Sequence, residues 1–437
     1  MKLPRELREF VRYASLNVLG MAGLSCYILA DTYFISKGMG SDGLAALNLA
    51  LPVYSFIHGT GLLFGMGGAT RFSILKNQGR TEEGQAAFTH ALVIGELQAA
   101  LFFLLGVFGS DTLAYMLGGR GEVYEMSRTY LQMLLLFSPA VILNDVISCF
   151  VRNDGAPHLA AAGLLTGCIA NIILDYVFIF PMQMGIFGAV LATEIAPVLS
   201  LCVMSPFFFR KKNSFHLCRC ALKGRLTADI AGAGLPSLVT EVSSGIVIMV
   251  FNAILLRMEG ETAVAAYGVV TNLALVATAI YTGLAQGVQP LMSGYYGRGE
   301  NESVRRLLGY GLKLSLTMAG AIYAAILLWA QPIAGVFNSA GESRLQELAV
   351  WGLKVYFLYG FFAGVNILLA TFFTCVERPR PANIMSLLRG LLLVVPMAFL
   401  LSAAGGMTGL WAAVAVTEAL VTGLGLRFYF KKNEKTV

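Results

Sequence analysis

The sequence predicts an all-α integral membrane protein with twelve transmembrane helices, arranged as two six-helix lobes related by pseudo-two-fold symmetry. Three observations predict this class. First, 57% of the 437 residues are hydrophobic and only 13% are charged, about half the charged fraction of an ordinary soluble domain. Second, the apolar runs are roughly 20 residues long, the length of a membrane-spanning helix, whereas barrel strands alternate over about 10. Third, the two halves of the chain resemble each other.

Twelve apolar segments are expected to cross the membrane, each as a helix because lipid offers the backbone no hydrogen-bond partner. They lie near residues 13–36, 44–70, 87–108, 129–150, 159–180, 185–208, 229–256, 264–292, 307–331, 350–374, 384–403 and 409–429. The charged, amphipathic residues before the first segment are expected to form a cytoplasmic helix that leads into it.

The basic residues predict the orientation of these segments. With the N-terminus in the cytoplasm, 23 of the 31 Lys and Arg residues fall in cytoplasmic connections and 6 in outer ones. Cytoplasmic loops are enriched in Lys and Arg, so both termini are expected in the cytoplasm and the chain in the plasma or inner membrane. The same placement accounts for the net charge of +6 without a nucleic-acid partner.

Short segments recur at offsets of 220 to 224 residues. The pairs are Ala45-Ala46 with Ala265-Ala266, Pro157 with Pro381, and GIFGAVLATE (185–194) with GLWAAVAVTE (409–418). They predict an N-terminal lobe over residues 1–208, a basic cytoplasmic linker over 209–228 and a C-terminal lobe over 229–437. Two lobes with the same topology suit a transporter that alternates access to a central cavity.

A group of polar residues lies inside the spans of the first lobe, where charge is costly. Asp31 lies in the first span, Asn171 and Asp175 are four apart on one face of the fifth, and Thr193 begins the sixth. Carboxylate, amide and hydroxyl oxygens suit sodium, and burial beside a second carboxylate equally favours a proton. We expect Asn144 to extend this group, while its neighbour Asp145 has Arg152 as an alternative partner.

The second lobe offers fewer acids. Glu241 in the seventh span is expected either to attract a cationic substrate or to form a buried hydrogen bond. Gln286 and Gln289 in the eighth span are expected to line the cavity or to pack. Glu194 and Glu418 match in the repeat and are interpreted as shared architecture, and His58 as structural.

Several motifs in their order resemble the multidrug and toxic compound extrusion (MATE) family, of the bacterial type that includes DinF- and MepA-like members. They are ADTYFISKGMGSDGLAALNLALP (30–52), GTGLLFGMGGATRFSILKNQGR (59–80), FVRNDGAP (150–157), NIILDYVFIF (171–180), VAAYGVVTN (264–272) and AQGVQPLMS (285–293). The resemblance implies V-shaped lobes and antiport against sodium ions or protons. It also implies that Asp31, Asn171, Asp175 and Thr193 form a cation site, with Na⁺ as the candidate metal.

The functional expectation is a secondary antiporter that exports amphipathic organic compounds, chiefly cations. The alternative is a flippase for a lipid-linked sugar or precursor, which would need basic residues in the cavity to hold pyrophosphate; the spans contain mainly Lys313 and Arg389. No HExxH motif or P-loop is present, so no catalytic residue and no cofactor besides the coupling ion is expected. The expected partners are a small organic substrate and membrane lipid, and a monomer suffices.

Overall fold

The computed structural model describes residues 4–209, 213–338 and 342–431, and within these ranges the chain is helical without strands. The first lobe contains α1 (Arg5–Asn77), α2 (Thr81–Phe108), α3 (Ser110–Met116), α4 (Gly121–Leu136), α5 (Ser138–Asn153), α6 (Pro157–Ile179) and α7 (Gly185–Phe209). The second contains α8 (Gly224–Glu259), α9 (Glu261–Gly297), α10 (Asn301–Phe337), α11 (Ser343–Tyr356), η1 (Phe357–Tyr359), α12 (Gly360–Cys375), α13 (Pro379–Leu387), η2 (Leu388–Leu392) and α14 (Val394–Phe430).

The helices cross the membrane twelve times, which confirms the predicted fold class. Ten described helices are long and apolar enough to span, and the bent pair α4–α5 makes an eleventh crossing. Two of the ten come from α1, which reverses at Gly40, a residue with non-helical backbone angles. A similar reversal at Gly406 divides α14 between the last two crossings, so residues 379–405 supply the twelfth.

The backbone turns of the two lobes repeat each other. Gly40 (φ 65°, ψ −150°) and Gly260 (φ 74°, ψ −155°) join the first two crossings of their lobes and are 220 residues apart. Only glycine adopts these angles readily. The start of the fifth crossing shows which residues of the two lobes correspond in this part of the chain. In the first lobe this crossing begins with α6 at Pro157, and in the second it begins with α13 at Pro379. Pro157 therefore aligns with Pro379, an offset of 222, and the pairing with Pro381 was wrong.

Each lobe has its own hydrophobic core, and the lobes interlock at one end. One buried cluster draws on residues 35–230 and the other on residues 251–421 together with Phe10 and Ala14 from the start of α1. The backbones of α1 and α8 touch where a side chain on Gly67 would overlap the carbonyl of Ile230 and one on Gly234 would overlap that of Leu63. The lobes are therefore closest beside the start of α8.

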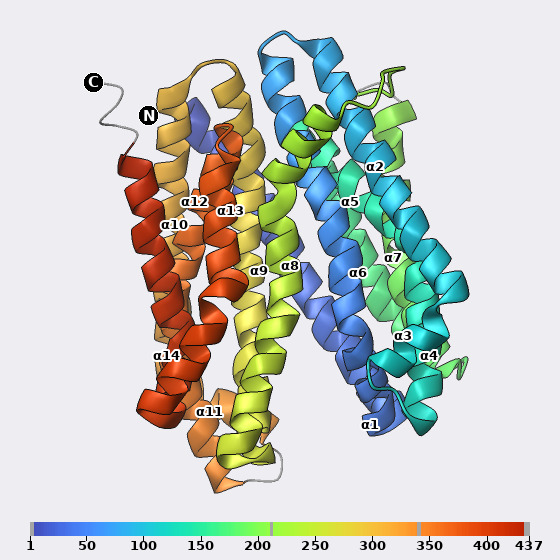
Figure 1. Cartoon of the computed structure of the whole chain (residues 1–437), viewed down its shortest axis with the longest axis vertical. Helices are drawn as coiled ribbons and strands as arrows, with labels where there is room; N and C mark the ends of the chain where they lie inside the picture. The colour runs from blue at the N-terminus through green and yellow to red at the C-terminus, as the bar shows by residue number, and fades with distance from the viewer. Residues whose placement is uncertain (1–3, 210–212, 339–341, 432–437) are drawn as a thin grey trace.

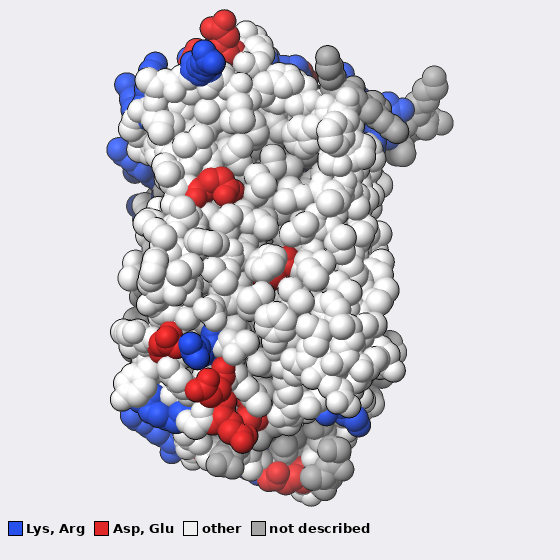
Figure 2. Space-filling model, turned by 90° about the vertical axis from the view of Figure 1, so that its right-hand side faces the viewer, with Lys and Arg blue, Asp and Glu red and all other residues white. Residues whose placement is uncertain are grey.

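We call one end of the molecule the linker end. It carries the connections 78–80, 213–223, 298–300 and 376–378, and the opposite end carries Gly40, Gly260 and Gly406. Figure 1 shows the two groups of helices meeting toward the linker end, at the top, and diverging toward the other. Between the described residues, polar contacts across the lobes gather at the linker end, as in Arg71–Glu377 and Arg298–Asn77. On the face in Figure 2, charged side chains lie mainly near the two ends and the band between them is almost uncharged, as lipid requires.

Candidate functional site

The structure brings together four of the predicted cation-site residues inside the first lobe. Asp31 comes from the first half of α1, Asn171 and Asp175 from one face of α6, and Thr193 from the first turns of α7. All four are buried. The amide of Asn171 lies 3.4 Å from the hydroxyl of Thr193. With its carboxamide turned over, Asn171 donates to Asp175 Oδ2 at 3.0 Å and accepts from the Thr193 amide at 3.2 Å.

The two carboxyl groups of this cluster face each other. Asp31 and Asp175 are close enough for their carboxyl groups to interact electrostatically, and Oδ1 of each has no hydrogen-bond partner in the described chain. Neither carboxyl forms an ion pair with a described Lys or Arg. A buried carboxylate is unfavourable unless a charge compensates it, so the arrangement can hold a cation or a proton.

A residue that the sequence did not single out completes the cluster. Tyr130 on α4 is buried, and its hydroxyl lies beside Thr193, close to both carboxyl groups. A phenolic hydroxyl supplies one more oxygen ligand or proton donor. Nothing in the sequence around Tyr130 distinguishes it from the other aromatic residues of the spans.

Asn144 belongs to a neighbouring cavity of about 80 Å³ instead of touching the carboxyl pair. This cavity lies between α1, α5, α6 and α7, and Thr193 lines it as well. Asp145 lies there too and forms an ion pair with His58, Nδ1 to Oδ2 at 2.8 Å. The alternative partner Arg152 instead donates to Asn17 at 2.9 Å and to Gln286 at 2.7 Å.

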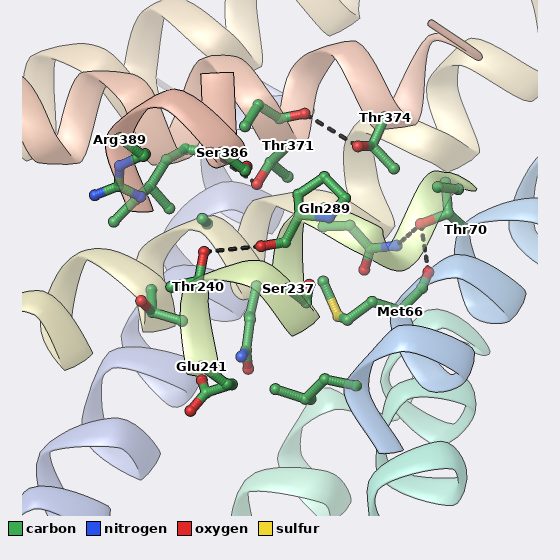
Figure 3. A pocket seen from close by; sticks show the side chains of 18 residues that line it. Met66, Thr70, Ser237, Thr240, Glu241, Gln289, Thr371, Thr374, Ser386 and Arg389 are labelled. Atoms are coloured by element: carbon green, nitrogen blue, oxygen red, sulfur yellow. Dashed lines mark hydrogen bonds between the residues drawn. The ribbon is translucent and has the colours of Figure 1, made fainter. Parts of the chain in front are cut away.

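Glu241 faces this ion pair from the second lobe. It lies on α8, close enough to interact electrostatically with His58 and Asp145. A cavity of about 160 Å³ separates the lobes here, lined from the first lobe by α1, α5, α6 and α7 and from the second by Glu241 and Gln286. Glu241 also lines a second cavity of about 70 Å³, in which Figure 3 shows it together with Gln289 and Arg389.

The two glutamines of α9 line these cavities and also connect the lobes. Gln286 Oε1 accepts from Arg152, while Gln289 accepts from Asn153 at 3.0 Å and donates to Thr70 at 2.5 Å. Gln289 is buried. Both side-chain amides therefore form hydrogen bonds that join the two lobes at the linker end.

The second lobe has a neutralised acid at the position that matches Glu194. Glu418 forms an ion pair with Arg389, whose two nitrogens donate to Oε1 at 2.7 and 3.0 Å, and its Oε2 accepts from Asn366 at 2.6 Å. Thr422 in turn donates to Asn366 at 3.1 Å. The carboxylate has its charge compensated within the protein, so this part of the second lobe needs no added cation.

Two repeated six-helix lobes with polar cavities between them are the arrangement of a membrane transporter. The sequence profile of the MatE family matches residues 18–177 and 236–400. The chain therefore belongs to the MatE family of membrane transporters.

Individual relatives agree with this assignment. The chain is 25% identical over 414 residues to multidrug export protein MepA from Staphylococcus saprophyticus, and the alignment covers 94% of this chain and 91% of that protein. It is 27% identical over 402 residues to MepA from Staphylococcus aureus strain MRSA252, covering 90% and 87%.

Solved structures share the fold. An outward-facing multidrug resistance MATE family transporter matches with a TM-score of 0.91 at 21% identity, covering 99% of this chain and 98% of that one. A MOP superfamily transporter from Pyrococcus furiosus Vc1, whose binding pocket is described as having reverse polarity, matches with the same values.

Proposed function

We propose that this transporter exports amphipathic organic compounds, mainly cations, in exchange for Na⁺ or H⁺ through alternating access. The observation that carries the proposal is the Asp31–Asp175 pair, buried in the first lobe with one unpartnered oxygen on each carboxyl. Occupation of this pair by a cation changes the charge buried in one lobe by one unit. A change of that size is large enough to bias a two-state equilibrium between lobe arrangements.

The substrate would bind between the lobes, near Glu241. Its carboxyl lines both inter-lobe cavities, and apolar side chains such as Leu62 and Met66 surround it. Asp145, the other acid of the larger cavity, is paired with His58, so Glu241 is the acid left to attract a compound with a positive charge and a hydrophobic body. Relatives named multidrug export proteins support this substrate class.

The orientation proposed from the basic residues places the linker end and both termini in the cytoplasm of a cell whose plasma membrane holds the protein. The arrangement described here then has its cytoplasmic side closed by the contacts across the lobes. Release of substrate to the outside and uptake of the coupling cation would take place from this arrangement.

A lipid-linked precursor flippase remains the alternative function. Such a substrate carries pyrophosphate, which requires uncommitted cations. In the two cavities that Glu241 lines, the guanidinium groups are those of Arg152 and Arg389, and they are engaged by Gln286 and Glu418. This engagement favours export of organic compounds over flipping of an anionic lipid.

The test is ethidium efflux from cells that lack their own pumps, with wild type, Asp31→Asn and Asp175→Asn at equal expression. We expect wild type to export and both variants to lose export. Asp111→Asn is the matched control, because that carboxylate lies on the surface beside Arg128, and it should export like wild type. Sodium removal and a protonophore identify the driving ion. Full export by both site variants would refute the site, and accumulation of a lipid precursor on deletion without efflux would favour the flippase.

A further inference from the structure

A further buried acid without a hydrogen-bond partner lies beside the proposed coupling pair. Glu194 follows Thr193 on α7 and is 1% exposed, yet neither of its carboxyl oxygens has a hydrogen-bond partner in the described chain. It faces the cavity of about 80 Å³ between α1, α5, α6 and α7. The position therefore carries a buried acid for which the protein supplies no compensating contact.

The oxygens around this cavity form a coherent set. Asn144 Oδ1 and Ser200 Oγ line it and, like Glu194, have no partner among the described residues. Ser200 is itself buried. Carboxylate, amide and hydroxyl oxygens are the hard ligands of an alkali cation, and the volume exceeds what one water molecule needs.

The internal repeat provides a comparison within the same chain. Glu194 matches Glu418 at an offset of 224, and Glu418 is compensated by Arg389 and Asn366. At the offset of 222 that the helix starts establish, Asn366 matches Asn144. The two lobes thus share the acid and the amide, and they differ in the cation.

The missing cation has a structural explanation. Arg389 is the tenth residue after Pro379, and the tenth residue after Pro157 is Gly167. Gly167 lines the cavity of Glu194, and a Cβ there would approach the carbonyl oxygen of Ala196 to 3.1 Å. In place of a guanidinium, the first lobe has a glycine whose backbone borders the cavity.

We infer that the Glu194 cavity is a second site for a monovalent cation, Na⁺, with Glu194, Asn144 and Ser200 as its oxygen ligands. This inference rests on the proposed cation coupling and adds to it, since Thr193 borders both sites. The first lobe would bind two sodium ions, one at Asp31–Asp175 and one at Glu194. In the second lobe Arg389 fills the matching position permanently.

The test is sodium binding by the purified full-length protein, measured as radioactive sodium bound per chain at saturation. We expect two ions for wild type, one each for Glu194→Gln and Asp175→Asn, and none for the double variant. Glu125→Gln, at an exposed position of α4, is the control and should bind two. Ser200→Ala removes only one oxygen, so this variant should still bind two ions, one of them with several-fold lower affinity. The test therefore stays decisive if Glu194→Gln fails to fold.

The outcomes separate this inference from the proposed function. If Asp175→Asn loses an ion while Glu194→Gln and Ser200→Ala bind like wild type, the second site is refuted and the coupling pair stands. If wild type binds no sodium but ethidium efflux collapses with a protonophore, the sodium assignment is refuted while antiport stands.

Discussion

Replacing Gln289 with leucine should open the linker end. The side chain makes two hydrogen bonds to the other lobe, at 2.5 Å to Thr70 and 3.0 Å from Asn153. Thr70 and Asn153 each keep one further bond, to Met66 and Cys149 carbonyls, so the loss is about 1 kcal/mol per bond. Water satisfies both groups once the lobes part. The closed arrangement should lose about 2 kcal/mol, so the ratio of open to closed molecules rises by about 30-fold.

The shift can be measured as a distance distribution between spin labels. Labels at Gln78 and Asn301, both exposed at the linker end on opposite lobes, would be introduced after replacement of the native cysteines. Gln289→Leu should add a longer distance that is rare in wild type. Gln98→Leu, an identical change at an exposed position of α2, should leave the distribution unchanged. An unaltered distribution for Gln289→Leu would show that these bonds do not hold the lobes together.

Three further changes follow from the packing. Gly61→Ala should reduce export several-fold in the efflux assay, because the added methyl group overlaps the Asp145 carboxylate and disrupts its ion pair; wild-type efflux would count against a role for that pair. Arg389→Gln should lower the free energy of unfolding by about 3–5 kcal/mol, because it leaves the buried Glu418 without its ion pair. Changing both residues to Gln should recover most of the lost melting temperature. Equal melting temperatures for the single variant and wild type would contradict this. Gly260→Ala should lower the free energy of unfolding by about 1–3 kcal/mol, since the backbone angles of Gly260 disfavour any residue with a side chain. A melting temperature equal to that of wild type would refute this prediction.

The fold was predictable because lipid imposes one simple rule on each segment. Apolar runs and basic connections reflect that rule locally, and the internal repeat gives the same number of crossings in each half, so the twelve crossings could be predicted without tertiary information. The residue-by-residue alignment of the two halves was harder to predict, because Pro379 and Pro381 both lie near the start of one helix. Only the observed start of α13 shows that Pro379 is the match.

The proposed site was predictable in part. Asn171 and Asp175 share a helix face by their spacing alone, whereas their meeting with Asp31 and Thr193 was implied only by family resemblance. Tyr130 could not be found, since an aromatic residue in a span is ordinary and its value comes from lying opposite Thr193.

The charged pairs were not predictable for a similar reason. The sequence offered Arg152, seven residues further along the same span, as a partner for Asp145, and only the packing of α1 against α5 brings His58 to it. Glu194 and Glu418 look equivalent in sequence. Their difference depends on Arg389, which lies on another element.

The most direct test of the account uses purified protein in lipid vesicles with no other energy source. An imposed sodium or proton gradient should drive ethidium movement in the opposite direction by wild type, and Asp31→Asn and Asp175→Asn should abolish that gradient-driven movement. Ethidium movement that ignores both gradients, or that persists undiminished in the two variants, would contradict the claim that the buried Asp31–Asp175 pair couples cation entry to export.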